Sequence, residues 1–242
     1  EGFEDKIKGN LFYKILEIID AKKPNTLILE NVKNLHSIHN GETFSKIKNE
    51  LEMRNYNFSY KVIDSKYYNC PQSRQRIYIV CSKSSNYEFR DVKNDIVPVS
   101  RILDPNIKTF FNYSPKYYLE ETKSNKSNIL NKKSSMMKYI LINKETKKGG
   151  RQGERIYSID TCGPTICASA GGPGGKTGFY LVNEEPIKIR KLSINETLKM
   201  FGFSNNYKFN SLKSKNKMLF YLGNSIVVNV LSEIIQDLAF PA

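Results

Sequence analysis

Residues 24–34 read Pro-Asn-Thr-Leu-Ile-Leu-Glu-Asn-Val-Lys-Asn, and this stretch indicates the class of fold. Its apolar run, residues 26–29, has the length and composition of a buried strand in a parallel sheet. Polar residues follow directly, beginning with Glu30. Functional groups of open α/β sheets gather at the carboxyl ends of such strands. We therefore expect a buried parallel strand that ends at Glu30. The carboxyl group of Glu30 either acts on a ligand or serves only as a helix cap or salt-bridge partner.

Regular elements are expected on both sides of this strand. Apolar residues at helical spacing predict a helix over residues 9–22, which ends before Pro24, and a second helix over 43–53. Strands are predicted over residues 57–63 and 76–81. This alternation of helices and strands is typical of the α/β class.

The second half of the chain has a different composition. Residues 83–148 are rich in Lys, Asn, Ser and Tyr, and residues 149–178 are rich in glycine, as turns between short strands would be. A helix is predicted over residues 225–238. We therefore expect a first domain at residues 1–100, a smaller domain at 101–210, and a return segment at 211–242 whose helix packs on the first domain.

Charge and composition narrow the class of partner. The 242 residues include 38 Lys and Arg against 24 Asp and Glu, a net charge of +14, which favours a polyanion such as nucleic acid. The mean hydropathy is −0.50, and no apolar run has the roughly 18 residues that a membrane span needs. No secretory signal is visible, so we expect a cytoplasmic protein.

The cysteines indicate neither a metal site nor a disulfide framework. Four cysteines and two histidines lack the spacing of a zinc site, so no metal is expected. Cys162 and Cys167 could form a bridge across a short turn, but free thiols are favoured in a reducing compartment.

Three polar clusters could carry chemistry. Arg74 and Arg76 lie two residues apart at the entry to a strand, so both guanidinium groups could hold phosphate or carbonyl oxygens, or form a solvated basic edge. Asn224 and Ser225 could cap the last helix and present N–H groups to a ligand, although capping alone explains them. Gln and Arg in residues 149–155 could read base edges, or be ordinary polar loop residues.

The order and spacing of five segments resemble a bacterial DNA (cytosine-5) methyltransferase of the HhaI-like restriction-modification type, in about its C-terminal two-thirds. The segments are Glu1-Gly2-Phe3-Glu4-Asp5 through Gly9-Asn10-Leu11-Phe12, Lys23-Pro24 through Asn34, Gln72-x-Arg74-x-Arg76, Arg190-Lys191-Leu192 through Gly202-Phe203, and Gly223-Asn224-Ser225. The resemblance implies part of a Rossmann-like S-adenosylmethionine-dependent methyltransferase domain at 1–100 and a target-recognition domain at 101–210.

The resemblance also assigns roles to residues. Glu30, Arg74 and Arg76 match catalytic residues: the glutamate contacts the N3 and amino edge of a flipped cytosine, and the arginines hold its O2 and the catalytic loop. The residues expected at the S-adenosylmethionine are Leu11, Asn224 and Ser225. Those that resemble DNA-recognition loops are Gln152, Arg155, Thr165 and Ile166, and the similarity to enzymes that modify GCGC is only suggestive of the target.

The nucleophile of the family is the Cys of a Pro-Cys-Gln motif, which lies upstream of the segment that begins at Gly2. We expect it in an N-terminal portion of the same or a separate polypeptide, together with the glycine-rich cofactor loop. Residues 69–72 read Asn-Cys-Pro-Gln, in which Cys70 has the wrong order and context for that nucleophile.

The function expected from this resemblance is methylation of carbon 5 of cytosine in a specific duplex DNA sequence, by base flipping and covalent attack. Two alternatives remain at this point. The chain could be a catalytically inactive module that only reads DNA, or an RNA cytosine-5 methyltransferase.

Overall fold

The computed structural model describes residues 9–123, 136–209 and 211–240, which form two compact units. Unit 1 combines Glu1–Asp64, Gln75–Asp91 and Gln236–Ala242, and unit 2 combines Ser65–Arg74 and Val92–Ile235. The chain therefore passes between the units several times, including once between Arg74 and Gln75.

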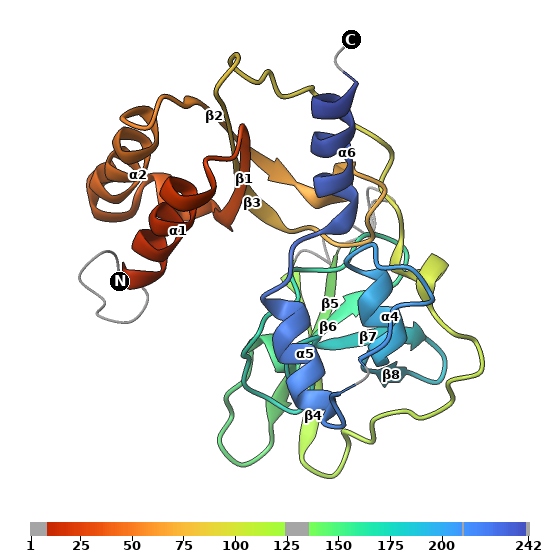
Figure 1. Cartoon of the computed structure of the whole chain (residues 1–242). Coiled ribbons are helices and arrows are strands. Elements are labelled where there is room, and N and C mark those ends of the chain that lie inside the picture. Colours follow the sequence, from red (N-terminus) through yellow and green to blue (C-terminus); the bar gives the residue numbers. More distant parts are fainter. Residues whose placement is uncertain (1–8, 124–135, 210, 241–242) are drawn as a thin grey trace. The chain divides into compact units, whose positions relative to one another are not determined.

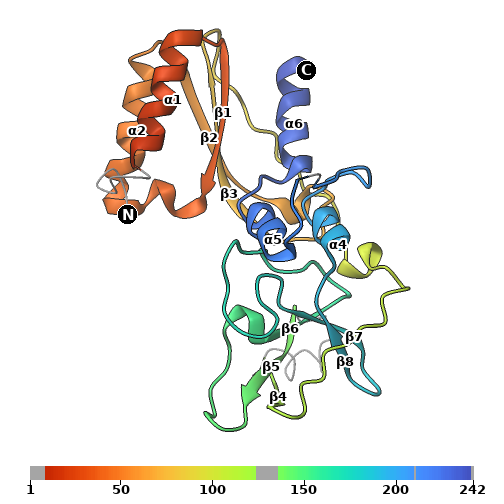
Figure 2. The ribbon, with the colours of Figure 1, turned by 60° about the horizontal axis from the view of Figure 1, so that its bottom comes forward.

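Unit 1 is a three-stranded sheet with two helices (Figures 1 and 2). Its elements are α1 (Gly9–Lys22), β1 (Thr26–Val32), the short 3-10 helices η1 (Lys33–His36) and η2 (Ile38–Gly41), α2 (Glu42–Glu52), β2 (Asn57–Asp64) and β3 (Gln75–Ser82). The strand order is β1-β3-β2, and both pairings are antiparallel. The helices and strands predicted for this part of the chain are confirmed, with ends that differ by at most two residues.

Both helices of unit 1 cover the same face of the sheet, as Figure 2 shows. Alternate residues of β3, namely Ile77, Ile79 and Cys81, are buried in the core cluster. The cluster also contains Leu16 and Ile19 of α1 and, from α2, Phe44, Ile47 and Leu51. Because side chains alternate along a strand, the other residues of β3, which include Arg76 and Tyr78, lie on the opposite face.

The prediction of a buried parallel strand was wrong in two respects. β1 is antiparallel to β3, with Glu30 opposite Tyr78 in the register. Its residues are half-buried or exposed, since among the described strands β1 is at the edge of the sheet. An apolar run of four residues occurs in parallel and in antiparallel strands alike, so the sequence could not distinguish them.

Unit 2 contains a five-stranded sheet and short helical segments (Figure 1). Its elements are η3 (Ser65–Tyr67), η4 (Val99–Ile102), β4 (Tyr117–Glu121), β5 (Met137–Asn143), η5 (Gln152–Glu154), β6 (Arg155–Ser158), β7 (Phe179–Asn183), β8 (Lys188–Arg190), α4 (Ile194–Lys199), α5 (Lys215–Gly223) and most of α6 (Val228–Ala239). The strands follow one another in sequence order, and only β6 and β7 are parallel. Leu141, Ile156, Phe179, Leu181 and Ile189 form the core of this sheet.

The compact units differ from the expected division at residues 100 and 210. Residues 65–74 belong to unit 2, and of the expected return segment only residues 236–242 belong to unit 1. Asp237 attaches the C-terminal end of α6 to the rest of unit 1. Its carboxylate accepts a hydrogen bond from Tyr87 Oη at 3.1 Å and forms an ion pair with Arg90. Among the described residues no single helix is long and apolar enough to cross a membrane, although α5 and α6, which are bent by 41° at their break, pass that test as a pair.

Candidate functional site

Glu30 and Arg76 form an ion pair on one face of the sheet of unit 1. Arg76 lies opposite Val32 in the register, two positions from the partner of Glu30, so the two side chains are diagonal neighbours on adjacent strands. Arg76 Nε lies 3.2 Å from Glu30 Oε1, and the side chains are 16% and 21% exposed. Arg76 Nη1 also donates to the carbonyl of Gln75 at 2.8 Å. The structure thus brings together two of the three expected catalytic residues, on the face opposite the helices.

Arg74 has a different environment, although it is only two residues from Arg76. It precedes β3, belongs to unit 2 and is 3% exposed. Its Nη1 donates to the carbonyl of Ile166 at 3.2 Å, and its Nη2 donates to the carbonyls of Gly223 and Ser225, each at 3.0 Å. The guanidinium group also lies 5.3 Å from the centre of the Phe201 ring. These contacts make Arg74 a positioning residue that ties three segments of unit 2 together.

Gln72 supports the same junction and is fully buried. Its Nε2 donates to the carbonyl of Met200 at 2.8 Å, and its Oε1 accepts from the N–H of Ile166 at 2.9 Å. Thr165 Oγ1 donates to the carbonyl of Ser73 at 2.8 Å. The segment Gln72-Ser73-Arg74 therefore holds residues 165–166 in place, a structural role that the sequence pattern did not reveal.

Asn224 and Ser225 end α5 instead of capping the last helix, which begins at Val228. The N–H of Asn224 bonds the carbonyls of Phe220 and Tyr221, and the N–H of Ser225 bonds that of Leu222. Neither of the two possible roles, capping the last helix or presenting these N–H groups to a ligand, is therefore realised, and the side chains of Asn224 and Ser225 are the groups that a ligand could contact. A Cβ at Gly223 would overlap the backbone of Cys167 and Ala168, so this turn requires glycine.

The third expected cofactor residue, Leu11, lies in unit 1 on α1, with 63% of its surface exposed. An exposed leucine is available to pack against an apolar ligand group. The residues that precede it in the same motif, 1–8, lie outside the described residues.

The four expected DNA-contacting residues differ in accessibility. Arg155 is exposed, and its Nε donates to the carbonyl of Gly150 at 2.8 Å. Gln152 is half-buried, and its amide donates to the carbonyl of Thr165 at 2.8 Å and accepts from Cys167 Sγ at 3.1 Å. Ile166 is fully buried. Thr165 is half-buried like Gln152, so Arg155 is the most accessible of the four side chains.

None of the four cysteines forms a disulfide in the structure, so Cys162 and Cys167 are not bridged. Cys70, Cys81 and Cys162 are buried, and Cys70 Sγ donates to the carbonyl of Met200 at 3.0 Å. Burial, with a smaller contribution from the charge of Glu52, raises the pKa of Cys81 to about 12. Within the described residues, no group of three or more His, Cys, Asp or Glu side chains could hold a metal ion.

Unit 2 contains a buried ion pair that sequence reasoning missed. Arg190 and Glu196 are 4% and 2% exposed and form two hydrogen bonds, Nη1 to Oε2 at 2.8 Å and Nη2 to Oε1 at 2.7 Å. The carboxylate also accepts from the N–H groups of Ser193 and Asp104, each at 2.7 Å. Burial opposes ionisation of Glu196, but these hydrogen bonds outweigh it and lower its pKa. The sequence signal was the capping box that Ser193 and Glu196 form at the start of α4.

The net positive charge belongs entirely to one unit. The sequence ranges of unit 2 contain 25 Lys and Arg against 11 Asp and Glu, whereas those of unit 1 contain 13 of each. The whole excess of +14 therefore lies in unit 2. A polyanion would be attracted to that unit first.

The family model and the similar proteins found by comparison agree with one another. A sequence model described as "C-5 cytosine-specific DNA methylase" matches residues 1–239. The type II methyltransferase M.HhaI of Haemophilus parahaemolyticus is 34% identical over 242 residues, which cover 97% of this chain and 68% of that protein. M.Bsp6I, a type II methyltransferase of a Bacillus strain, is 33% identical over 249 residues, which cover 98% of this chain and 72% of its own length.

Solved structures agree on the fold. The crystal structure of the S. pombe Dnmt2 methyltransferase superposes with a TM-score of 0.60 at 18% identity, over 95% of this chain and 72% of that one. At this level of identity the likeness supports the α/β methyltransferase fold and no finer statement about activity.

Proposed function

Since this chain belongs to the C-5 cytosine-specific DNA methylase family, we propose that it serves in the methylation of carbon 5 of cytosine within a specific duplex DNA sequence. The observation that carries the proposal is the pairing of Glu30 with Arg76, with 3.2 Å between Oε1 and Nε. The pair has the donors and acceptors that the edge of a cytosine needs. S-adenosylmethionine would supply the methyl group.

Glu30 and Arg76 complement different atoms of the base. A carboxyl group can accept a hydrogen bond from the amino group of cytosine and, when protonated, donate one to N3. A guanidinium group only donates, so Arg76 would bind O2. Both contacts stabilise the negative charge that develops on the ring when a thiolate adds to carbon 6. A base inside a duplex is not accessible to these groups, so the cytosine must be flipped out.

The nucleophile is proposed to come from a thiol other than the four cysteines of this chain. Attack requires an accessible thiolate. Cys70, Cys81 and Cys162 are buried, and Cys167 Sγ is hydrogen-bonded to Gln152. We infer that an N-terminal portion, in the same or a separate polypeptide, carries the Pro-Cys-Gln motif and the glycine-rich cofactor loop.

The residues proposed to hold S-adenosylmethionine fit such a ligand in their chemistry. Leu11 offers an exposed apolar side chain for the adenine ring, and Asn224 is exposed with an amide that can donate and accept. Ser225 offers a hydroxyl group. Because the N–H groups of Asn224 and Ser225 are bonded to carbonyls of α5, their side chains are the groups that would bind the cofactor.

Unit 2 is proposed to contact the duplex. Its excess of positive charge favours phosphates, and Arg155 is exposed for direct contact. Gln152, Thr165 and Ile166 would act by fixing the shape of the recognition loops, since each is hydrogen-bonded within unit 2.

The test is Glu30→Gln, assayed with the N-terminal portion present. We expect methyl transfer to fall by about 10²- to 10⁴-fold, the usual contribution of an acid or base group, with little change in DNA affinity. Glu17→Gln is the matched control, because Glu17 is an exposed carboxylate of the same unit. Unchanged transfer in Glu30→Gln would remove Glu30 from the reaction. Comparison of duplex DNA with RNA in the same assay tests the substrate class.

A further inference from the structure

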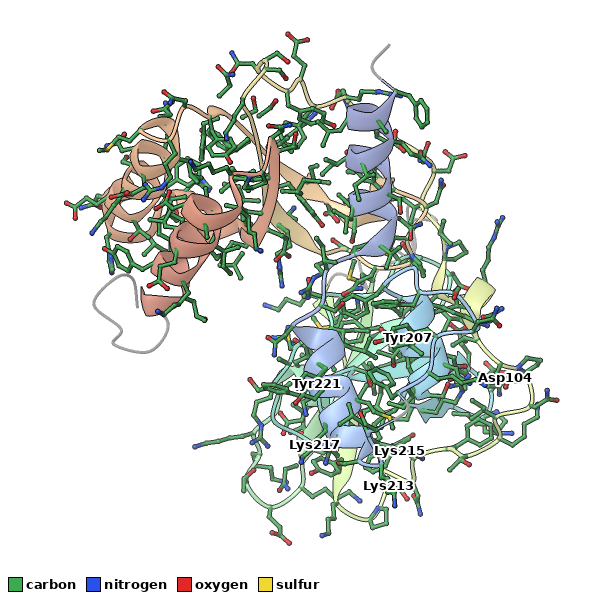
Figure 3. The ribbon with its side chains drawn as sticks, viewed as in Figure 1. Asp104, Tyr207, Lys213, Lys215, Lys217 and Tyr221 are labelled. Carbon is green, nitrogen blue, oxygen red and sulfur yellow. The ribbon has the colours of Figure 1, made fainter. Side chains whose placement is uncertain are left out.

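An exposed group of lysines surrounds the start of α5. Lys213, Lys215 and Lys217 are exposed, and among the described residues none of their ammonium groups has an ion-pair partner. Figure 3 shows the three side chains around the N-terminal end of the helix, with Tyr221 farther along it. The sequence between Glu196 and Glu233 contains no Asp or Glu at all. The positive charge here is therefore not compensated along the chain.

A cavity of about 820 Å³ continues this surface within unit 2. Lys176, Lys191 and Lys215 line it, and no acidic residue does. Lys176 Nζ donates to the carbonyl of Asn216 at 3.0 Å, which fixes it beside the first turn of α5. Arg190 also lines the cavity, but its charge is balanced by Glu196. The lysines of the cavity and those of α5 thus form one surface, named here the lysine surface: Lys176, Lys191, Lys213, Lys215 and Lys217.

We propose that the lysine surface binds the phosphodiester backbone of duplex DNA without reading its bases. This inference rests on the proposed function, which supplies the partner. Lysine presents a point charge on a flexible stem, which suits phosphate oxygens better than the fixed donor pattern of a base edge. Lys176 adjoins the residues expected near the target bases, since its carbonyl accepts a hydrogen bond from Gln152 Nε2 at 3.4 Å. The other four lysines belong to later segments of the sequence.

The proposal predicts a change in the salt dependence of DNA binding as well as in the affinity for DNA. Each phosphate neutralised by a lysine releases condensed counterions and contributes about −0.9 to the slope of log Kobs against log salt. Removal of three such contacts should reduce the magnitude of the slope by about two to three. The loss should be the same on every duplex, because backbone contacts carry no sequence information.

The experiment uses the full chain carrying Lys213→Gln, Lys215→Gln and Lys217→Gln, titrated by fluorescence anisotropy with labelled duplexes of two unrelated sequences over a range of salt. Because all three positions are exposed, these substitutions should leave the fold intact. Lys213→Arg, Lys215→Arg and Lys217→Arg should retain the slope. Lys22→Gln, Lys46→Gln and Lys48→Gln remove the same charge from exposed positions of unit 1 and should leave the slope near that of the parent.

The outcomes separate this inference from the proposed function. A shallower slope on both duplexes, in the α5 variant only, supports the inference. An unchanged slope in that variant overturns it while the proposed function stands. An equal loss in the unit 1 control also overturns it, because net charge alone would then be responsible. A parent chain without salt-dependent affinity for duplex DNA would contradict the DNA partner itself.

Discussion

Glu30 and Arg76 lie on adjacent antiparallel strands two register positions apart, and 3.2 Å separates Glu30 Oε1 from Arg76 Nε. Arg74 is two residues earlier, yet its guanidinium group is bonded to three backbone carbonyls of unit 2. The two arginines of one short motif therefore have separable tasks. Arg76 faces the proposed base site, whereas Arg74 connects segments of unit 2 through hydrogen bonds to their backbone.

Arg76→Lys should impair catalysis and leave the fold intact. Lysine keeps the charge but loses the planar fork, so the contact to a base oxygen weakens. Loss of one such stabilising donor costs about 10²- to 10³-fold in turnover. The free energy of unfolding should change by no more than about 1 kcal/mol, as for a partly exposed pair. Methyl-transfer rates and urea denaturation measure the two effects, and a large loss of stability with normal transfer would reverse this assignment.

Arg74→Ala should destabilise the fold directly. The change leaves three buried carbonyls without their charged donor, for which we expect a loss of about 3–5 kcal/mol in the free energy of unfolding. Arg101→Ala, at an exposed position of the same unit, is the control and should cost little. Denaturant titration gives both values. Normal stability of Arg74→Ala together with lost methyl transfer would instead place Arg74 at the base.

The buried pair of Arg190 and Glu196 should make unit 2 sensitive to acid. The pKa of Glu196 is lower in the folded protein than its ordinary value of 4.5. Its stabilising contribution is therefore complete above 4.5 and is lost as the pH falls through the lowered pKa of the folded state. Glu196→Gln should be less stable at neutral pH, by about 3–5 kcal/mol, and should lose less on acidification. Equal losses in parent and variant between pH 5 and 3 would rule out this account.

The cysteines should differ in reactivity. Burial raises the pKa of Cys81 to about 12, and Cys70 and Cys162 are also buried, so only the half-buried Cys167 should react readily with a thiol reagent at pH 8. Cys70→Ser should retain methyl transfer in the completed enzyme. Mass spectrometry of the labelled peptides identifies the reactive thiol. Abolished transfer in Cys70→Ser, with the fold preserved, would make Cys70 a nucleophile after all.

Local signals in the sequence predicted local structure well. The spacing of apolar residues before Pro24 gave the bounds of α1, residues 9–22, without error. α5 was missed, because its polar residues lie in the first turn and its apolar residues follow as one run, so that residues 215–223 show no one-sided apolar pattern. Glu30 and Arg76 were both singled out, but their pairing depends on the register of β1 and β3.

Other features depended on contacts that no short pattern contains. The direction of β1 was misjudged, because pairing partners distant in sequence decide it. The burial of Arg74 was equally hidden, since its acceptors are carbonyls about 90 to 150 residues away in the chain. The types of side chain indicated which residues could take part in the reaction. Tertiary contacts decide which of these side chains are free to contact a ligand.

The most direct test of the central claim is transfer of labelled methyl from S-adenosylmethionine to mixed-sequence duplex DNA, followed by identification of the labelled nucleoside. It compares this chain alone with the chain plus a polypeptide that carries the Pro-Cys-Gln motif. We predict 5-methylcytosine in the mixture and no label with the chain alone. Label transferred by the chain alone would contradict the proposed source of the nucleophile, and label on any other base would contradict cytosine-5 methylation.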